Sequence, residues 1–218
     1  TSDGDVYVYA RLDESIVALH PTTGRVSWER REFYDVEGFY LRDDGVYGCV
    51  EIDGYGDFYL IRLDPDTGRN RWKTDIEQPV SRLVKGDSDL YFVTKSFDIG
   101  DLDGRGYAYR LNPVTGRVHW TFEDDKRGSE FFSGDPTLVR FKNRVFGLDR
   151  EHGHAEWSFA DESLSIRCTT DDRVLLSGDS ENFVLDRAAG RVDGSFTQSD
   201  ICYMTGGGAI FVASGGSV

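Results

Sequence analysis

The sequence contains no uninterrupted run of 18 apolar residues, so it offers no candidate transmembrane helix. Lysine is scarce: five lysines stand beside 20 arginines. The 25 basic residues face 39 acidic ones, which gives a formal net charge of −14 and a pI near 4.6. Nucleic-acid-binding domains carry a basic face, and this balance excludes one of any size. It also argues against a polybasic module that binds membrane surfaces.

Cysteine and proline are also scarce. The three cysteines, Cys49, Cys168 and Cys202, lie far apart and form no Cys-x-x-Cys pair. This spacing argues against a zinc ribbon, a thioredoxin-type site or a disulfide framework, and we expect buried free thiols. Five prolines against 25 glycines indicate many tight turns between extended segments.

The acidic residues are mainly aspartate, with 27 Asp against 12 Glu. Proteins from thermophiles are instead enriched in lysine and glutamate. A negative, aspartate-rich and lysine-poor surface suits a high-salt environment, where counterions screen the self-repulsion. We therefore interpret the chain as halophilic, and a mesophilic source with a GC-rich genome is the alternative.

One ten-residue segment recurs five times, at residues 19–28, 63–72, 111–120, 148–157 and 185–194. Each copy starts with Leu and has Gly at its sixth position, and four copies end in Trp. Successive glycines lie 44, 48, 37 and 37 residues apart, a spacing that suits the four-stranded blades of a β-propeller. The repeat residues are Gly24, Trp28, Gly68, Trp72, Gly116, Trp120, Gly153, Trp157 and Gly190.

Each position of the repeat has a physical reason. Asp or Asn opens a turn by capping the following amides, and Pro, where present, presets φ. Gly supplies the left-handed conformation that a bulged hairpin needs. Trp follows four residues later, on the outgoing strand, where we expect it to be buried against a neighbouring blade. Gly194 replaces the fifth Trp, so we expect that blade to pack less well.

The sequence therefore predicts an all-β protein, a single domain over residues 1–218 with about five blades of four antiparallel strands. The first blade begins at its second strand, and the fourth shows only three, at 137–141, 144–148 and 155–159. Two more strands, 201–204 and 210–213, follow the fifth blade. Two arrangements follow from this pattern. In the first, strand 201–204 completes the first blade of a five-bladed ring. In the second, the chain is an incomplete part of a seven- or eight-bladed ring. We favour the second arrangement.

The recurring segments resemble the PQQ-like (quinoprotein-type) β-propeller repeat, over most of residues 6–196. Within that family, the chain is most similar to the non-enzymatic branch of outer-membrane assembly lipoproteins. This resemblance implies a binding or scaffold protein of the cell envelope with a protein or peptide partner, although a cytoplasmic location stays open. The alternative is an oxidoreductase dependent on pyrroloquinoline quinone (PQQ). We expect no enzyme and no cofactor, because the blades are few, no cysteines are adjacent, and every Trp is at the blade-packing position.

Two candidate metal sites remain. The loop with Asp98, Asp101 and Asp103 places oxygen ligands close together, as calcium sites do, but lacks the remaining ligands of an EF-hand. We interpret it as an acidic solvated loop, with a looser calcium site as the alternative. His152 and His154 have a spacing that can chelate a metal, although simple surface exposure is the favoured interpretation.

Aromatic residues are dense between positions 33 and 59, with eight Phe or Tyr residues. A docking face for a ligand or peptide would have this composition. Packing between strands has the same composition, because aromatic side chains favour β-sheets, and we prefer that interpretation.

We predict that the stability of the fold rises with salt. Raising the ionic strength from 0.1 to 1 M shortens the Debye length from about 10 Å to about 3 Å, which screens the net charge of −14. Thermal melts in potassium chloride test this directly. A melting temperature that stays flat or falls toward molar salt would exclude the halophilic interpretation.

Overall fold

The computed structural model describes residues 6–10, 15–42, 45–86, 88–94, 104–126, 128–197, 201–204 and 210–213. These residues form 21 β-strands. No helix of this part of the chain is long and apolar enough to cross a membrane.

Consecutive antiparallel strands form the sheets, which we number as blades. The first blade holds β1 (Val6–Ala10), β2 (Ser15–Leu19) and β3 (Val26–Arg30). The second holds β4 (Asp35–Arg42), β5 (Gly45–Glu51), β6 (Phe58–Leu63) and β7 (Asn70–Ile76). The third holds β8 (Val80–Lys85), β9 (Leu90–Thr94), β10 (Gly106–Leu111) and β11 (Val118–Asp124). The fourth holds β12 (Gly128–Phe132), β13 (Thr137–Phe141), β14 (Arg144–Leu148) and β15 (Ala155–Ala160). The fifth holds β16 (Ser165–Thr169), β17 (Arg173–Ser177), β18 (Glu181–Asp186) and β19 (Val192–Thr197), and the hairpin of β20 (Ile201–Met204) and β21 (Ile210–Ala213) follows.

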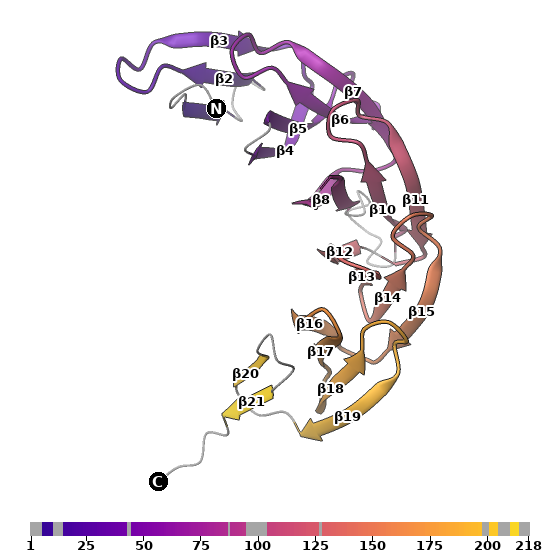
Figure 1. The fold of residues 1–218 in the computed structure, drawn as a ribbon. Coiled ribbons are helices and arrows are strands. Elements are labelled where there is room, and N and C mark those ends of the chain that lie inside the picture. Colours follow the sequence, from indigo (N-terminus) through magenta and orange to yellow (C-terminus); the bar gives the residue numbers. More distant parts are fainter. Residues whose placement is uncertain are drawn as a thin grey trace.

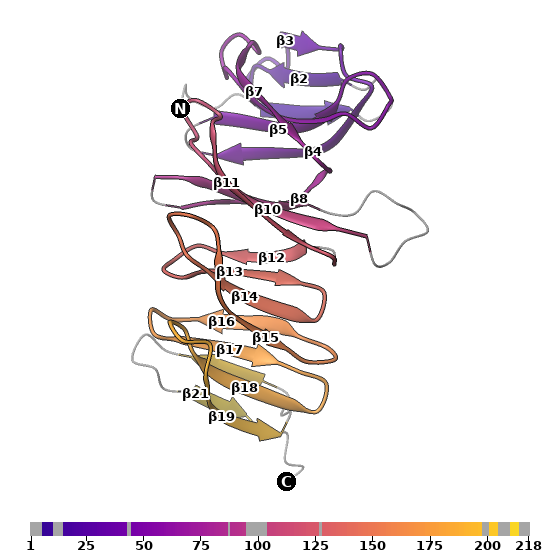
Figure 2. The ribbon, with the colours of Figure 1, turned by 90° about the vertical axis from the view of Figure 1, so that its right-hand side faces the viewer.

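The blades follow one another around an open arc (Figure 1). Strands β4, β8, β12 and β16 line its concave side, and the Trp-bearing strands β3, β7, β11 and β15 lie on the convex side. Seen from the side, the sheets stack along the arc like successive layers (Figure 2). Four hydrophobic clusters lie between neighbouring sheets, so the core is divided among the blade interfaces.

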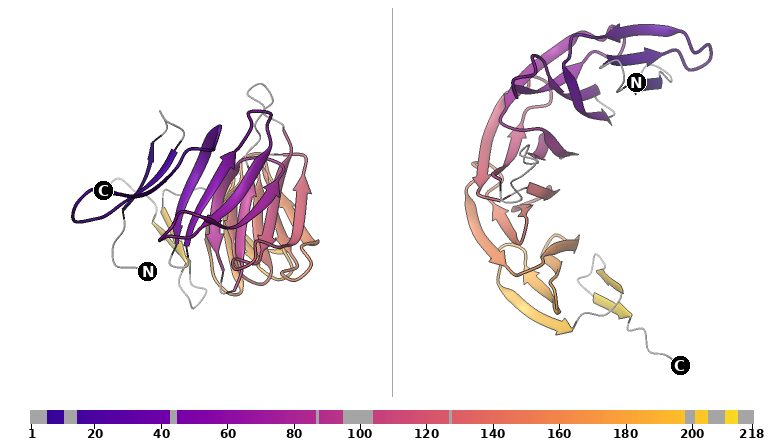
Figure 3. Two further views of the ribbon diagram at one scale, coloured as in Figure 1. Left: turned by 90° about the horizontal axis from the view of Figure 1, so that it is seen from above. Right: turned by 180° about the vertical axis from the view of Figure 1, so that it is seen from behind.

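The first and last strands do not meet. The two ends of the arc lie apart in two opposite views (Figure 3). Strand β20 pairs with β21 and lies beside β16, not beside β1. The five-bladed ring closed by strand 201–204 is therefore not formed. Strand β20 follows β19 directly and takes the innermost position of a next blade, as β16 does after β15.

The all-β propeller architecture is confirmed, and one strand was missed. The fourth blade has four strands, because β12 (Gly128–Phe132) pairs with β13. Its sequence Gly-Ser-Glu-Phe-Phe has no alternating pattern, and a bulge at Ser129 interrupts its register. Strand β12 therefore forms through its pairing with β13, and its local sequence pattern does not predict it.

The recurrent turn has the expected geometry in all five copies. Each turn glycine has a positive φ, between 63° and 75°. Asp64 accepts hydrogen bonds from the backbone N–H groups of Asp66 and Thr67, at 3.0 and 2.9 Å. Asn112 caps its own turn in the same way. In the first turn the Nδ1 atom of His20 takes over this role, at the longer distance of 3.3 Å.

A hydrogen bond and the packing of each tryptophan join its blade to the next, and we call this contact the blade lock. The indole N–H of Trp72 donates to the carbonyl oxygen of Pro113, the second residue of the following turn, at 2.9 Å. The other three tryptophans make the same bond, Trp28 to Pro65, Trp120 to Arg150 and Trp157 to Arg187, at 2.7 to 3.0 Å. Trp28, Trp72 and Trp120 are buried, whereas Trp157 is only half-buried. Trp157 packs on a turn with the small side chains Ala188 and Ala189.

The turn glycine is required for a second reason besides its φ. A Cβ atom on Gly116 would lie 2.7 Å from Cδ2 of Trp72, and one on Gly68 would lie 2.5 Å from Cε3 of Trp28. Each indole thus occupies the space that a side chain would need. Gly24 differs, because a Cβ there would meet nothing within 4 Å of it. Gly194, in place of the fifth Trp, likewise faces open space.

Two arginines donate a further hydrogen bond to the carbonyl oxygens that accept the indole bonds. Arg62 donates to the same Pro113 carbonyl as Trp72, at 2.7 Å, and Arg110 donates to the Arg150 carbonyl at 2.6 Å. The buried carboxylate of Asp89 holds Arg110 at 3.0 Å. Burial raises the pKa of Asp89, but the hydrogen bonds from Arg110 and Ser88 outweigh it and lower the pKa overall. The charged pair therefore orients Arg110 toward the next blade.

We predict that Gly116→Ala destabilises the fold more than Gly24→Ala. Both variants force alanine into a left-handed conformation, which costs about 1–2 kcal/mol. Only Gly116→Ala also displaces a tryptophan, and such overpacking costs about 1–3 kcal/mol more. Urea unfolding of both variants measures the difference, and equal losses would show that the indole does not depend on the glycine.

Candidate functional site

The concave side of the arc carries a mixed apolar and cationic surface. We define the inner strip as Leu41 and Arg42 of β4, Arg82 of β8, Phe132 of β12 and Arg167 of β16. Leu41 is 55% exposed and offers apolar area to solvent. The guanidinium of Arg82 lies 5.7 Å from the centre of the Phe132 ring, in a cation–π contact that spans two blades.

The charge of this surface differs from that of the whole chain. The four innermost strands carry three described cationic side chains, Arg42, Arg82 and Arg167, against three acids, Asp35, Glu37 and Glu130. Among the described residues, no carboxylate pairs with Arg42, Arg82 or Arg167, whereas Glu130 pairs with Arg140. The described concave side therefore lacks the excess of acidic residues that gives the whole chain its net charge of −14.

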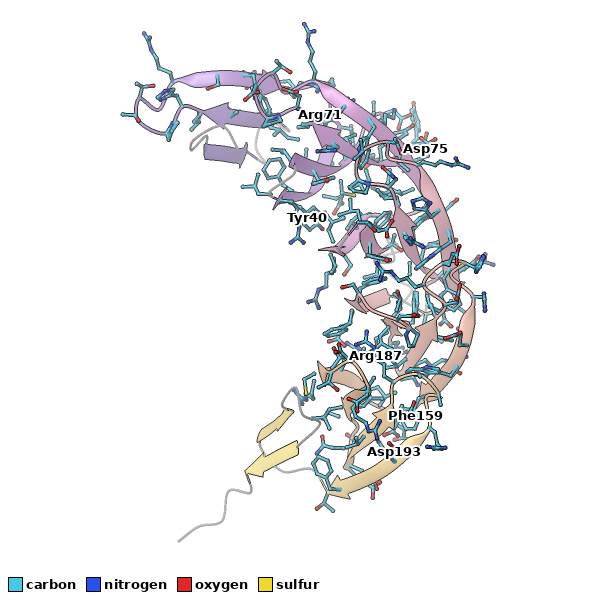
Figure 4. The ribbon with its side chains drawn as sticks, viewed as in Figure 1. Tyr40, Arg71, Asp75, Phe159, Arg187 and Asp193 are labelled. Atoms are coloured by element: carbon cyan, nitrogen blue, oxygen red, sulfur yellow. The ribbon has the colours of Figure 1, made fainter. Side chains whose placement is uncertain are left out.

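Side chains next to the strip fix the innermost strands relative to one another. The Tyr40 hydroxyl, on the inner side of the arc in Figure 4, donates to the carbonyl oxygen of Val80 at 3.3 Å. Burial raises the pKa of Tyr40 to about 12, so this hydroxyl stays protonated at neutral pH. Arg42 donates to the carbonyl oxygen of Leu83. The backbone under the strip is thus held from the preceding blade.

The fourth and fifth blades are joined in a similar way. Glu130 forms an ion pair with Arg140 at 2.7 Å and accepts a hydrogen bond from the Ile166 backbone N–H at 3.1 Å. Arg140 in turn donates to the carbonyl oxygen of Leu164 at 2.6 Å. The strip therefore rests on a preorganised surface.

A separate pocket of about 320 Å³ lies where β6 begins and β7 ends. It is lined by residues 56–59 and 75–77, and its acidic side chains are Asp57, Asp75 and Glu77. Burial and then the charges of Asp57 and Asp75 raise the pKa of Tyr59. Lys73 lies over the Tyr59 ring at 3.4 Å. The negative lining of this pocket disfavours anionic ligands.

The proposed calcium ligands cannot be placed. Asp98, Asp101 and Asp103 lie outside the described residues. The parallel acidic loop at 53–57 is described: its Tyr55 is exposed, and its Gly56 and Asp57 line the pocket above. Of the aromatic cluster at 33–59, Phe33, Tyr47 and Phe58 are buried in the core, whereas Tyr34 and Tyr55 are exposed.

The side chains of Cys49 and Cys168 are described. Cys49 is fully buried, and its sulfur accepts a hydrogen bond from the Val80 backbone N–H at 3.3 Å. Cys168, on the innermost strand β16, is only partly buried. Burial is thus as expected for Cys49 and incomplete for Cys168, and the side chain of Cys202 lies outside the described residues.

The four histidines have different surroundings. His20 caps the first turn, and His119 lies 3.6 Å from the buried carboxylate of Asp89. His152 and His154 lie on the fourth turn with exposed side chains, as the favoured interpretation expects. The structure adds Asp149 to this pair, and sequence spacing alone did not identify it as a third ligand.

The four tryptophans and the pocket at Tyr59 offer no site for PQQ, the cofactor that the family resemblance brings into question. A planar quinone needs an aromatic ring against its face, and all four tryptophans of the chain use their indoles to lock blades on the convex side. The pocket at Tyr59 is acidic and would repel the carboxylates of the quinone.

Comparison with known proteins places the chain in a family. The family model described as outer membrane protein assembly factor BamB matches residues 56–199. The chain belongs to this family. Its members share the PQQ-like repeat, and the match runs from β6 in the second blade to the end of the fifth blade. None of the curated protein sequences matches the chain.

Solved structures confirm the propeller fold at low sequence identity. BamB from Moraxella catarrhalis is 15% identical with a TM-score of 0.55, over 88% of this chain and 60% of that protein. Quinohemoprotein alcohol dehydrogenase from Comamonas testosteroni is 15% identical with a TM-score of 0.59, over 97% of this chain and 44% of the enzyme. Sqt1 from Saccharomyces cerevisiae is 12% identical with a TM-score of 0.57, over 91% of this chain and 61% of that protein. The chain thus spans about 60% or less of the length of these three proteins.

Proposed function

We propose that the chain is a non-enzymatic binding propeller that holds an extended segment of a partner protein on the inner strip. The observation that carries the proposal is the unpaired cationic and apolar surface of the strip. Exposed Leu41 and the Arg82–Phe132 pair offer apolar and aromatic contact area beside positive charge. Such mixed surfaces with arginine and aromatic anchors are typical of protein interfaces.

The chemistry of the strip selects the partner. Arg42, Arg82 and Arg167 have free guanidinium donors for carboxylates, and arginine binds carboxylates in a bidentate manner. Leu41 adds an apolar contact. The partner segment is therefore one with acidic and apolar side chains. Because the rest of the chain is acidic, an acidic segment meets attraction only at the strip, which restricts where it binds.

The family supports a binding role, since its description is that of an assembly factor. The dehydrogenases among the solved structures share the fold, and a shared fold does not carry an activity with it. The location of all four tryptophans in blade locks supports a function without PQQ.

The binding proposal can be tested by selecting a library of random linear peptides against the immobilised chain. We expect enriched peptides to combine acidic and apolar residues. The double variant Leu41→Glu and Arg82→Glu should weaken their binding at least tenfold. The control, Val114→Glu with Arg117→Glu, makes the same change of charge on an exposed outer turn and should leave binding unchanged. Equal losses in both variants, or no enriched peptides, would refute the inner strip as the binding surface.

The absence of quinone chemistry is tested by isothermal titration with PQQ, with and without calcium. We expect no saturable heat, because all four indoles are used in blade locks and the pocket at Tyr59 is acidic. Micromolar binding, together with reduction of a dye in the presence of an alcohol or a sugar, would replace this proposal with the oxidoreductase.

A further inference from the structure

The fourth turn departs from the other four at two positions. His152 stands where the other turns have Thr23, Thr67, Thr115 and Ala189. His154 stands where they all have arginine, at Arg25, Arg69, Arg117 and Arg191. Asp149 keeps the aspartate or asparagine that opens most of the turns. One turn thus combines two imidazoles with a carboxylate, a set that the repeat does not need for its fold.

The backbone of the turn brings these three side chains together. The Oδ1 atom of Asp149 lies 2.9 Å from Nδ1 of His152 and 4.0 Å from Nδ1 of His154. One ligand atom from each residue lies within 4.8 Å of the others. The two imidazole rings are stacked, with centroids 6.1 Å apart and planes 29° apart. Gly153, with a φ of 75°, lies between the two histidines in the sequence.

The three side chains are also accessible to a metal ion. The His152 backbone N–H donates to Oδ1 of Asp149 at 2.6 Å, which holds this carboxylate beside the two imidazoles. The side chains of His152 and His154 are 69% and 65% exposed, so an ion can approach from solvent. Imidazole and carboxylate ligands together suit zinc and its neighbours in the first transition row.

We propose that Asp149, His152 and His154 bind one divalent zinc ion on the outer surface of the fourth turn. Three protein ligands leave a fourth position for water, as is common for zinc. This site is independent of the inner strip, which lies on the opposite, concave side of the arc. It also differs from the loop with Asp98, Asp101 and Asp103, which supplies only oxygen ligands.

The same turn holds the lock between the third and fourth blades. The indole of Trp120 donates to the Arg150 carbonyl at 3.0 Å and packs against Gly153, between the two histidines in sequence. Arg110 donates to the same carbonyl. A zinc ion that closes the turn from outside therefore fixes the backbone that receives Trp120 from inside. The ion acts as a staple on one blade interface.

Binding is tested by titrating the full chain, free of any histidine tag, with zinc chloride at about pH 7.5, where imidazole is mostly neutral. We expect one saturable site. His152→Ala and His154→Ala should each weaken the affinity at least tenfold, and the controls His20→Ala and His119→Ala should not change it. The absence of saturable binding, or binding that both fourth-turn variants retain, would refute the site.

The position of the bound ion and its effect on stability are measured separately. Cupric ion quenches the fluorescence of nearby indoles. A titration with cupric ion should quench part of the tryptophan fluorescence of the native chain and of Trp72→Phe, but not that of Trp120→Phe. Zinc at about a hundred times its Kd should raise the melting temperature by about 5–10 °C in the native chain and not in His154→Ala. Quenching that persists in Trp120→Phe would place the ion elsewhere. An unchanged melting temperature with zinc bound would refute the staple.

Discussion

The hydrogen bond from a tryptophan indole to a turn carbonyl of the next blade is the interaction on which the rest of this structure depends. A propeller has no single core, and its blades stay together only through the faces that they share. The indole contributes both a large apolar area and a directional bond, so it fixes distance and orientation together. The turn glycine serves the same lock, because it provides both the left-handed turn and the space for the ring.

Because the lock needs only a backbone carbonyl and a glycine, the other turn positions are free to vary. Proline at the second position gives way to Arg150 and Arg187 without loss of the bond, since every residue has a carbonyl oxygen. Arg187 uses this freedom to reach back to the carbonyl oxygens of Ser133 and Pro136 in the preceding blade. In the fourth turn the same freedom admits two histidines, and hence the proposed zinc ligands.

The locks occupy the convex side, which leaves the concave side for other tasks. Every Trp is committed to packing, so the recognition that we propose depends on arginine, leucine and phenylalanine of the innermost strands. Those strands are tied to one another by Tyr40, Arg42, Glu130 and Arg140, which makes the surface rigid. A rigid surface of this kind loses little conformational entropy when a partner binds, which favours a binding role.

The sequence by itself determined the blades, the turns, the glycine conformations and the strand that bears each Trp. These features depend on local φ/ψ preferences and on alternation within a strand, which a few adjacent residues specify. It did not reveal β12, whose order comes from pairing with β13. Nor did it reveal the partners of Arg62, Arg110 and Arg82, the exposure of Cys168, or Asp149 as a neighbour of both histidines. The tertiary structure decided these features. The arginines meet their partners across blades, at separations of 40 to 51 residues along the chain. Asp149 meets the histidines through the conformation that the turn adopts.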